Sequence, residues 1–180
     1  MQVVTYAVQG PALITPNRIG DARGYFMEAF KDAWFREHVC DIGFVQDNQS
    51  LSAQVGTIRG LHYQEAPMEQ GKLVRCLKGA IFDVAVDIRP GSETFGQWIS
   101  AELSADNAQQ LWVPAGFAHG FCTLLPDTEV FYKVTNPYSR DHDRGMAFDD
   151  PEIGIKWPAD LANAVLSDKD RQQPSLATLR

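Results

Sequence analysis

The sequence predicts a single all-β domain of the jelly-roll type, spanning residues 1–180. Short apolar runs rich in Val, Ile, Phe, Trp and Tyr recur along the chain, and Gly and Pro turn signals separate them. A chain of 180 residues has the size of one domain, and it shows neither a repeat of fixed period nor a linker rich in Pro, Gly or Ser. Many short strands with few helices indicate a jelly-roll barrel or sandwich with a few short flanking helices.

The predicted elements follow one another from the N-terminus. Residues 1–16 alternate like an edge strand, which needs pairing or cover, and residues 31–39 ("KDAWFREHV") have a helical pattern. A second helix is predicted near residues 158–166 ("PADLANAVL"). Apolar and polar alternation predicts strands within residues 55–64, 71–79, 80–92, 95–103, 109–125 and 128–139.

Composition restricts the partners and the location that we expect. With 16 Lys and Arg against 23 Asp and Glu, the net charge of −7 argues against binding to nucleic acid polymers, although a small anionic ligand stays possible where arginines gather. The three cysteines are widely spaced and odd in number, which indicates neither a disulfide framework nor a zinc cluster. The sequence has no basic leader and no apolar run of about 18 residues, so we expect a cytoplasmic protein without a membrane span.

Strand alternation directs several polar side chains toward the interior. Tyr132 shares its parity with Val130 and Val134, and Lys72 shares its parity with Val74. An inward lysine is costly unless it has a partner. Each residue also has an ordinary reading, since a buried tyrosine often only packs and a lysine can lie at a solvated strand end.

His62 lies within the strand "IRGLHYQ" and raises the question of a core histidine, a metal ligand or a base. Gly60 shares its parity, although a bulge at this glycine would shift the register. A lone interior histidine is more often a hydrogen-bonded core residue than a catalyst. Several polar residues on predicted interior strands together favour a functional cavity, namely Arg59, His62, Lys72, His119 and Tyr132.

The sequence does not favour a metal site. Metal-binding cupins typically present two histidines one residue apart with a nearby glutamate, and a further histidine after a Pro-x-Gly turn. Here His62 is followed by Gln64 at the second position, while "PAGFAHGF" retains the turn and His119. Two ligands fall short of the three or four that a stable site needs, even if Glu65 or Glu69 could be recruited.

Seven blocks in order give the sequence a resemblance to the dTDP-4-dehydrorhamnose 3,5-epimerases, a family of metal-free cupins. The resemblance covers essentially the whole chain and is far more specific than any single block. The blocks are "DARGYFMEAF" (21–30), "FVQDNQS" (44–50), "IRGLHYQ" (58–64), "GKLVRCLKGAIFDVAVDIRPGSETFGQW" (71–98), "VPAGFAHGF" (113–121), "YKVTNPYS" (132–139) and "LSDKD" (166–170).

The resemblance implies a cofactor-free isomerase that inverts C3 and C5 of dTDP-4-dehydro-6-deoxy-D-glucose to give dTDP-4-dehydro-L-rhamnose, the precursor of dTDP-L-rhamnose. Both carbons adjoin the C4 carbonyl, and inversion needs a base on one face and a proton donor on the other. By resemblance His62 is the base, Tyr132 the donor, Lys72 the cation that stabilises the enolate, and Asp170 the carboxylate that orients His62. By pattern alone Asp170 lies in a polar loop, so a surface carboxylate is the alternative, and Asp168 could be confused with it.

The resemblance also implies a nucleotide-sugar pocket and a homodimer. Arginines would bind the diphosphate through their guanidinium forks, aromatic rings would stack on thymine, and the N-terminal segment would cross to the partner subunit. For His119 a structural hydrogen-bonding role is the alternative. The implied substrate-binding residues are Arg23, Phe26, Glu28, Gln46, Asn48, Arg59, His119 and Tyr138.

Other functions stay open at this point. A related enzyme could act as a dTDP-sugar 3-epimerase or 3,4-ketoisomerase, although the presence of both His62 and Tyr132 favours double epimerisation. A non-enzymatic sugar-binding jelly roll would have no reason to place a lysine, a histidine and a tyrosine together inward. A metal-dependent cupin oxygenase or isomerase would carry stoichiometric metal.

Overall fold

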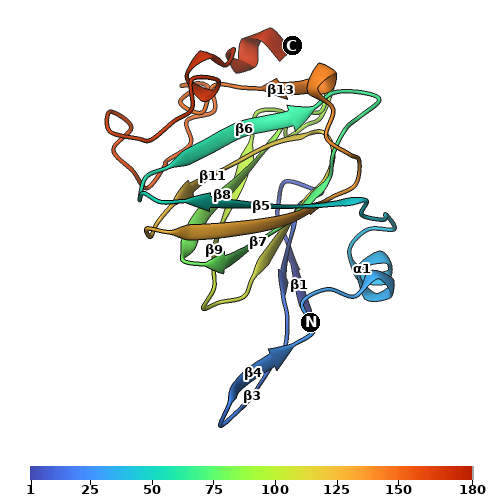
Figure 1. The fold of residues 1–180 in the computed structure, drawn as a ribbon. Helices are drawn as coiled ribbons and strands as arrows, with labels where there is room; N and C mark the ends of the chain where they lie inside the picture. The colour runs from blue at the N-terminus through green and yellow to red at the C-terminus, as the bar shows by residue number, and fades with distance from the viewer. Residues whose placement is uncertain (180) are drawn as a thin grey trace.

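The computed structural model describes residues 1–179, and most of its strands form two antiparallel sheets packed face to face (Figure 1). The six-stranded sheet has the order β1 (Gln2–Thr5), β2 (Ala12–Thr15), β10 (Gln110–Val113), β7 (Lys72–Lys78), β12 (Thr128–Val134) and β5 (Gln46–Ser52). The five-stranded sheet has the order β13 (Asp143–Gly145), β6 (Ile58–Gln64), β11 (Phe117–Thr123), β8 (Ala80–Asp87) and β9 (Trp98–Ser104). The predicted all-β jelly roll is confirmed.

Strand β8 is buried on both faces and shows how the layers are built. Ile81 and Ala85 point between the two sheets and pack in a cluster with residues of β7, β9, β10, β11 and β12. Val84 and Val86 point the other way and pack against the C-terminal segment, which contributes Trp157. That segment covers the β6 and β13 end of the five-stranded sheet (Figure 1). The apolar layers on both faces fix the side of each strand that faces the interior.

Helices are few, as predicted. Helix α1 (Asp32–His38) confirms the helix predicted at residues 31–39, and its Phe35 packs against Leu73 and Trp112. The other helices are short 3-10 turns, η1 (Arg140–His142), η2 (Asp170–Gln172) and η3 (Leu176–Leu179). None of the helices within residues 1–179 is both long and apolar enough to span a bilayer.

The helix predicted at residues 158–166 is wrong. Asp160 folds this segment into a turn, because its side chain accepts from the backbone N–H of Ala162 (3.1 Å) and from the Asn163 amide (2.7 Å). Val165 then forms an isolated parallel bridge with Thr57 of the segment before β6. Local side-chain bonding and pairing with the sheet therefore outweigh the helical pattern.

The N-terminal region forms two hairpins. The predicted edge strand of residues 1–16 is the pair β1 and β2, with β1 at the edge of the six-stranded sheet. Next come β3 (Arg18–Asp21) and β4 (Gly24–Met27), which pair only with each other among the strands of residues 1–179. This β3–β4 hairpin projects away from the body of the molecule (Figure 1).

Candidate active site

Four strands direct titratable side chains into one cavity of about 380 Å³ between the sheets. His62 comes from β6, Lys72 from β7, His119 from β11 and Tyr132 from β12. All four line the cavity together with Arg59, as expected from the grouping of these polar residues on interior strands, and strand alternation predicts the inward direction for Lys72 and Tyr132. The structure therefore brings these five predicted residues together.

A glycine allows β6 to approach β11 closely enough to place His62. Gly60 has φ +133°, and a Cβ at this position would lie 2.5 Å from Cα of Gly120 on β11. The pairing register of β11 shifts between His119 and Phe121, so the bulge considered at Gly60 is present. Beyond this irregularity His62 lies directly opposite His119, and the two imidazole rings enter the same cavity.

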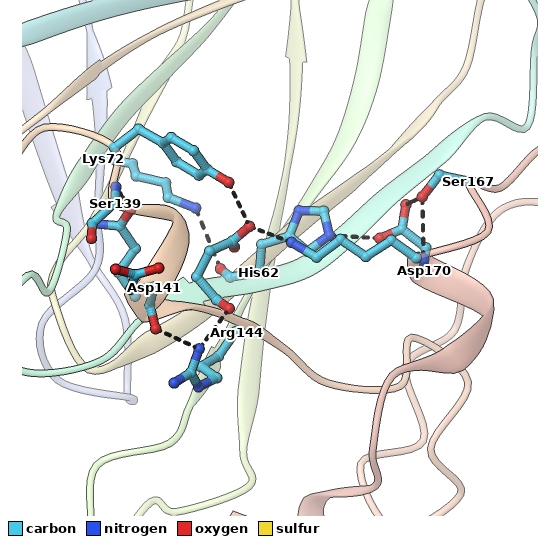
Figure 2. Close-up of polar contacts among 11 residues, drawn as sticks. His62, Lys72, Ser139, Asp141, Arg144, Ser167 and Asp170 are labelled. Carbon is cyan, nitrogen blue, oxygen red and sulfur yellow. Dashed lines mark hydrogen bonds and ion pairs between the residues drawn. The ribbon is translucent and has the colours of Figure 1, made fainter.

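Asp170 holds the ring of His62. Its Oδ1 lies 2.5 Å from His62 Nε2, and its Oδ2 accepts from Ser167 Oγ at 2.8 Å. Figure 2 shows this carboxylate on the opposite side of the imidazole from Lys72. Burial raises the pKa of Asp170, but the hydrogen bonds from His62 and Ser167 and the charge of His62 bring it below its usual value. Asp170 is 4% exposed, so the alternative of a surface carboxylate is wrong, whereas Asp168 is exposed.

The protonation state of Asp170 determines which nitrogen of His62 is free. An ionised carboxylate can only accept a hydrogen bond, so Nε2 of His62 carries the proton in this pair. The lone pair of the neutral ring is then on Nδ1. This arrangement fixes the tautomer of the histidine and stabilises the imidazolium that forms when Nδ1 takes up a proton.

Lys72 is a buried cation that lines the cavity. Its Nζ donates to the backbone carbonyl of His62 at 3.3 Å, as Figure 2 shows. Burial lowers the pKa of Lys72 to about 8, while the charges of Asp83 and Asp143 oppose this change and the charge of Lys169 adds to it. The predicted inward lysine is thus present, and negative groups partly offset the cost of burying it.

Tyr132 has the properties of a proton donor. Burial and the charge of Asp143 raise the pKa of its phenol, whereas the charge of Arg59 lowers it, with a net increase. The phenol is therefore protonated at neutral pH.

His119 forms a second histidine–carboxylate pair in the same cavity. Its Nε2 lies 2.7 Å from Oδ1 of Asp83, and both side chains are buried. The structural hydrogen bond considered for His119 is therefore real, and the ring also lines the cavity. Asp83 was missed from the sequence, although its parity with Ile81 and Ala85 in "AIFDVAVD" places it on the interior face.

A second cavity of about 460 Å³ adjoins the first and shares His62, Lys72 and Tyr132 with it. Three predicted binding residues line this second cavity, namely Gln46, Asn48 and Tyr138. The sequence did not identify two further lining residues, Asp143 and Lys169. They form an ion pair, and Tyr138 Oη donates to Asp143 at 3.1 Å. No periodic pattern marks either residue, because both lie outside the regular interior strands.

Three predicted binding residues lie elsewhere. Arg23 and Phe26 are on the β3–β4 hairpin, and Glu28 follows it. The Arg23 side chain is 89% exposed and forms an ion pair with Asp21 at 2.5 Å. Phe26 is 70% exposed, and Glu28 is also exposed. Neither cavity around His62 includes these three residues within one chain.

The residue in place of the second cupin histidine has a structural role. Gln64 is buried, and its Oε1 accepts from the Ser139 N–H at 2.7 Å while its Nε2 donates to the Met68 carbonyl at 2.5 Å. Glu65 forms an ion pair with Arg144. No cluster of three or more His, Cys, Asp or Glu side chains suited to a metal ion exists in residues 1–179.

Comparisons with known proteins identify the family of the chain. A family model described as dTDP-4-dehydrorhamnose 3,5-epimerase matches residues 5–178. A protein of that name from Sinorhizobium fredii is 64% identical over 93% of this chain and 85% of its own length.

Two solved structures share the fold. The dTDP-4-dehydrorhamnose 3,5-epimerase of Bacillus anthracis, with TDP and pyrophosphate bound, superposes with a TM-score of 0.92 at 48% identity, covering 97% of this chain and 98% of that one. The dTDP-6-deoxy-D-glucose-3,5-epimerase of Legionella pneumophila, in complex with dTDP-4-keto-L-rhamnose, has a TM-score of 0.92 at 42% identity, covering 99% and 96% of the two chains.

Proposed function

The chain belongs to the dTDP-4-dehydrorhamnose 3,5-epimerase family and is an isomerase, and we propose which of its residues carry the two inversions. The reaction inverts C3 and C5 of dTDP-4-dehydro-6-deoxy-D-glucose, giving dTDP-4-dehydro-L-rhamnose for dTDP-L-rhamnose synthesis. The observation that carries the assignment is the His62–Asp170 contact of 2.5 Å in a cavity that Lys72 and Tyr132 also line.

His62 removes the proton at each carbon. Nδ1 is the nitrogen free to act, because Nε2–H donates to Asp170. When Nδ1 takes the proton from C3 or C5, the electron pair of the C–H bond forms a double bond from that carbon to C4. The π electrons of the C4 carbonyl move onto its oxygen, which gives an enolate. Asp170 then faces an imidazolium and stabilises its charge.

Lys72 stabilises the enolate, and Tyr132 completes each inversion. An ammonium beside the developing oxyanion contributes about 3–4 kcal/mol in comparable sites. Tyr132 delivers a proton to the face opposite His62, because a base that returned its own proton would only restore the starting sugar. The raised pKa of the Tyr132 phenol supports this role, since the group stays protonated until it is needed.

The second cavity suits the nucleotide diphosphate. Arg59 lies at the edge of the first cavity, while Gln46, Asn48 and Tyr138 supply amides and an aromatic ring to the second. Tyr138 is 58% exposed, which leaves its ring face accessible for stacking on a base. We assign His119 to the sugar, since it pairs with His62 across the two strands and lines the same cavity.

A homodimer would supply the remaining groups. Arg23, Phe26 and Glu28 lie outside the cavities of their own chain, on or next to a hairpin that leaves Ile19 68% exposed. A second copy of the chain that receives this hairpin would cover its apolar residues and bring an arginine to the diphosphate.

As an enzyme of sugar-nucleotide biosynthesis, the protein would act in the cytoplasm. Cys40, Cys76 and Cys122 are free thiols, which suits a reducing compartment.

Deuterium incorporation tests the proposed mechanism. Chelator-treated protein is incubated with dTDP-4-dehydro-6-deoxy-D-glucose in D2O, and NMR locates the label and the stereochemistry. Label at both C3 and C5 with the L-lyxo product is expected. Label at C3 alone would identify a single-site epimerase, and no label at either carbon would return His62 to the status of a core histidine.

A further inference from the structure

We propose that Asp83 is a positioning residue of this site, which holds the ring of His119 and supplies a buried negative charge to the cavity that Lys72 lines. The inference rests on the proposed function, because it concerns two residues that we place at the reacting sugar. It adds a carboxylate that does not itself contact the reacting atoms.

Asp83 and Asp87 provide a comparison within one strand. Both belong to β8, both are 0% exposed, and their separation of four residues puts them on the same face. Asp87 accepts from the backbone and guanidinium of Arg89 and from the hydroxyls of Ser92 and Thr94, at 2.6 to 3.0 Å. Both of its oxygens are therefore satisfied, and it anchors the loop after β8.

Only one carboxylate oxygen of Asp83 has a hydrogen-bond donor within the described residues. Its Oδ1 accepts from His119 Nε2 at 2.7 Å, whereas no group in residues 1–179 donates a hydrogen bond to its buried Oδ2. A buried carboxylate oxygen without a donor destabilises a fold, and such groups occur in native proteins where they serve a function. Asp87 shows the form of an anchoring carboxylate in this strand, and Asp83 differs from it.

The neighbours of Asp83 identify what its charge acts on. Its negative charge is felt by Lys72 and Cys76 of β7 and by Tyr6, in addition to the hydrogen-bonded His119 of β11. Burial and this charge raise the pKa of the Tyr6 phenol and of the Cys76 thiol, to about 11 for the thiol, so both stay neutral. Among these groups Lys72 is the cation that Asp83 can stabilise.

The effect on Lys72 has a clear direction. Burial lowers its pKa, Asp83 and Asp143 raise it, and Lys169 lowers it, which leaves a value of about 8. Removal of the Asp83 charge would lower the pKa of Lys72 further. The ammonium that faces the enolate would then be lost at a lower pH.

The effect on His119 concerns its tautomer. Oδ1 of Asp83 accepts from Nε2–H, so the lone pair of the neutral ring lies on Nδ1. The ring lines the sugar cavity, where this nitrogen can accept a hydrogen bond from a sugar hydroxyl. One carboxylate would thus fix a hydrogen-bond acceptor on β11 and a cation on β7, which belong to the two sheets that enclose the cavity.

The test replaces the charge and keeps the shape. Asp83→Asn retains an oxygen that can accept from His119 Nε2–H, and kcat/KM for dTDP-4-dehydro-6-deoxy-D-glucose is measured from pH 6 to 9.5. We expect kcat/KM roughly tenfold lower than in the unmodified protein at pH 8.5 and within about threefold at pH 6.5, because the alkaline limb moves down by about one pH unit. Asp87→Asn makes the same chemical change in the same strand, and it should lower the unfolding temperature without moving the limb.

The results separate this inference from the proposed function. An alkaline limb unmoved by Asp83→Asn, or an equal loss of activity at every pH, would overturn the role of Asp83 toward Lys72. Loss of activity in Lys72→Met would still uphold the proposed function in that case. If Asp83→Asn does not fold, NMR of the unmodified protein labelled with 13C at the aspartate carboxyls decides, since a neutral Asp83 carboxyl at pH 7 would exclude it as a counter-charge.

Discussion

Two regions of the molecule carry the arginines and aromatic rings expected to bind substrate. They differ in how firmly the same chain holds these side chains beside a cavity. At the cavity, Arg59 donates to Ser52 Oγ at 3.0 Å and is held against the strands. On the β3–β4 hairpin, Arg23 forms an ion pair with Asp21, two residues away, and Phe26 lies in solvent. Under the proposed assignment, the residues for proton transfer lie in a cavity that one chain completes, whereas the hairpin residues Arg23 and Phe26 line neither cavity of their own chain.

The largest effect on activity is expected from substitution of His62. His62→Gln removes the base but retains an amide that can donate to Asp170, so the buried carboxylate keeps a partner. Turnover should fall about 10⁴-fold, and NMR in D2O should show no label at C3 or C5. Circular dichroism should match that of the unmodified protein. Full activity in this variant would refute the assignment of His62 as the base, and with it the inference that one chain completes the cavity for proton transfer.

Lys72 should follow, with an effect that depends on pH. Lys72→Met should lower kcat about 10²- to 10³-fold, since the enolate loses its cation. In the unmodified protein the pKa of Lys72 is about 8, so the ammonium is present below this pH and is lost as the pH rises through it. A pH series of kcat/KM should therefore fall above about pH 8.

Lys72→Arg is the matched control for this titration. A guanidinium keeps its charge throughout the range, so any remaining activity should lose the alkaline limb. If the alkaline fall of kcat/KM persists in Lys72→Arg, another titratable group of the cavity would be responsible for it.

Tyr132→Phe should distinguish proton removal on one face of the sugar from proton delivery on the other. His62 would still remove the proton, exchange it with solvent and return a deuteron to the same face, whereas delivery to the opposite face would stop. We expect product formation to fall about 10²-fold while deuterium still enters the unconverted substrate, as NMR of the recovered sugar would show. If exchange and inversion were lost in parallel, Tyr132 would not be the donor.

The same contrast explains what the sequence could predict. Lys72 and Tyr132 were placed inside because side chains on a strand alternate with period two, and this alternation was readable in β7 and β12. Asp170 could not be placed that way, because a 3-10 turn brings it to His62 across 108 residues of sequence. The helix expected at residues 158–166 does not form, because the Asp160 side chain stabilises a turn and Val165 pairs with the sheet through an isolated bridge.

The smallest effect is expected on the hairpin, and it tests whether a second chain receives it. Arg23→Ala should lower kcat/KM about tenfold, through the loss of one charge-assisted hydrogen bond to the diphosphate. Co-expression of Arg23→Ala with His62→Gln then distinguishes the two chains. If the hairpin serves the partner, a mixed dimer contains one site with an intact His62 and an intact Arg23, and activity per Arg23→Ala chain should rise about fivefold in an equal mixture. Activity that does not rise would mean that Arg23 acts within its own chain or not at all, and the hairpin would then not complete the site of a partner.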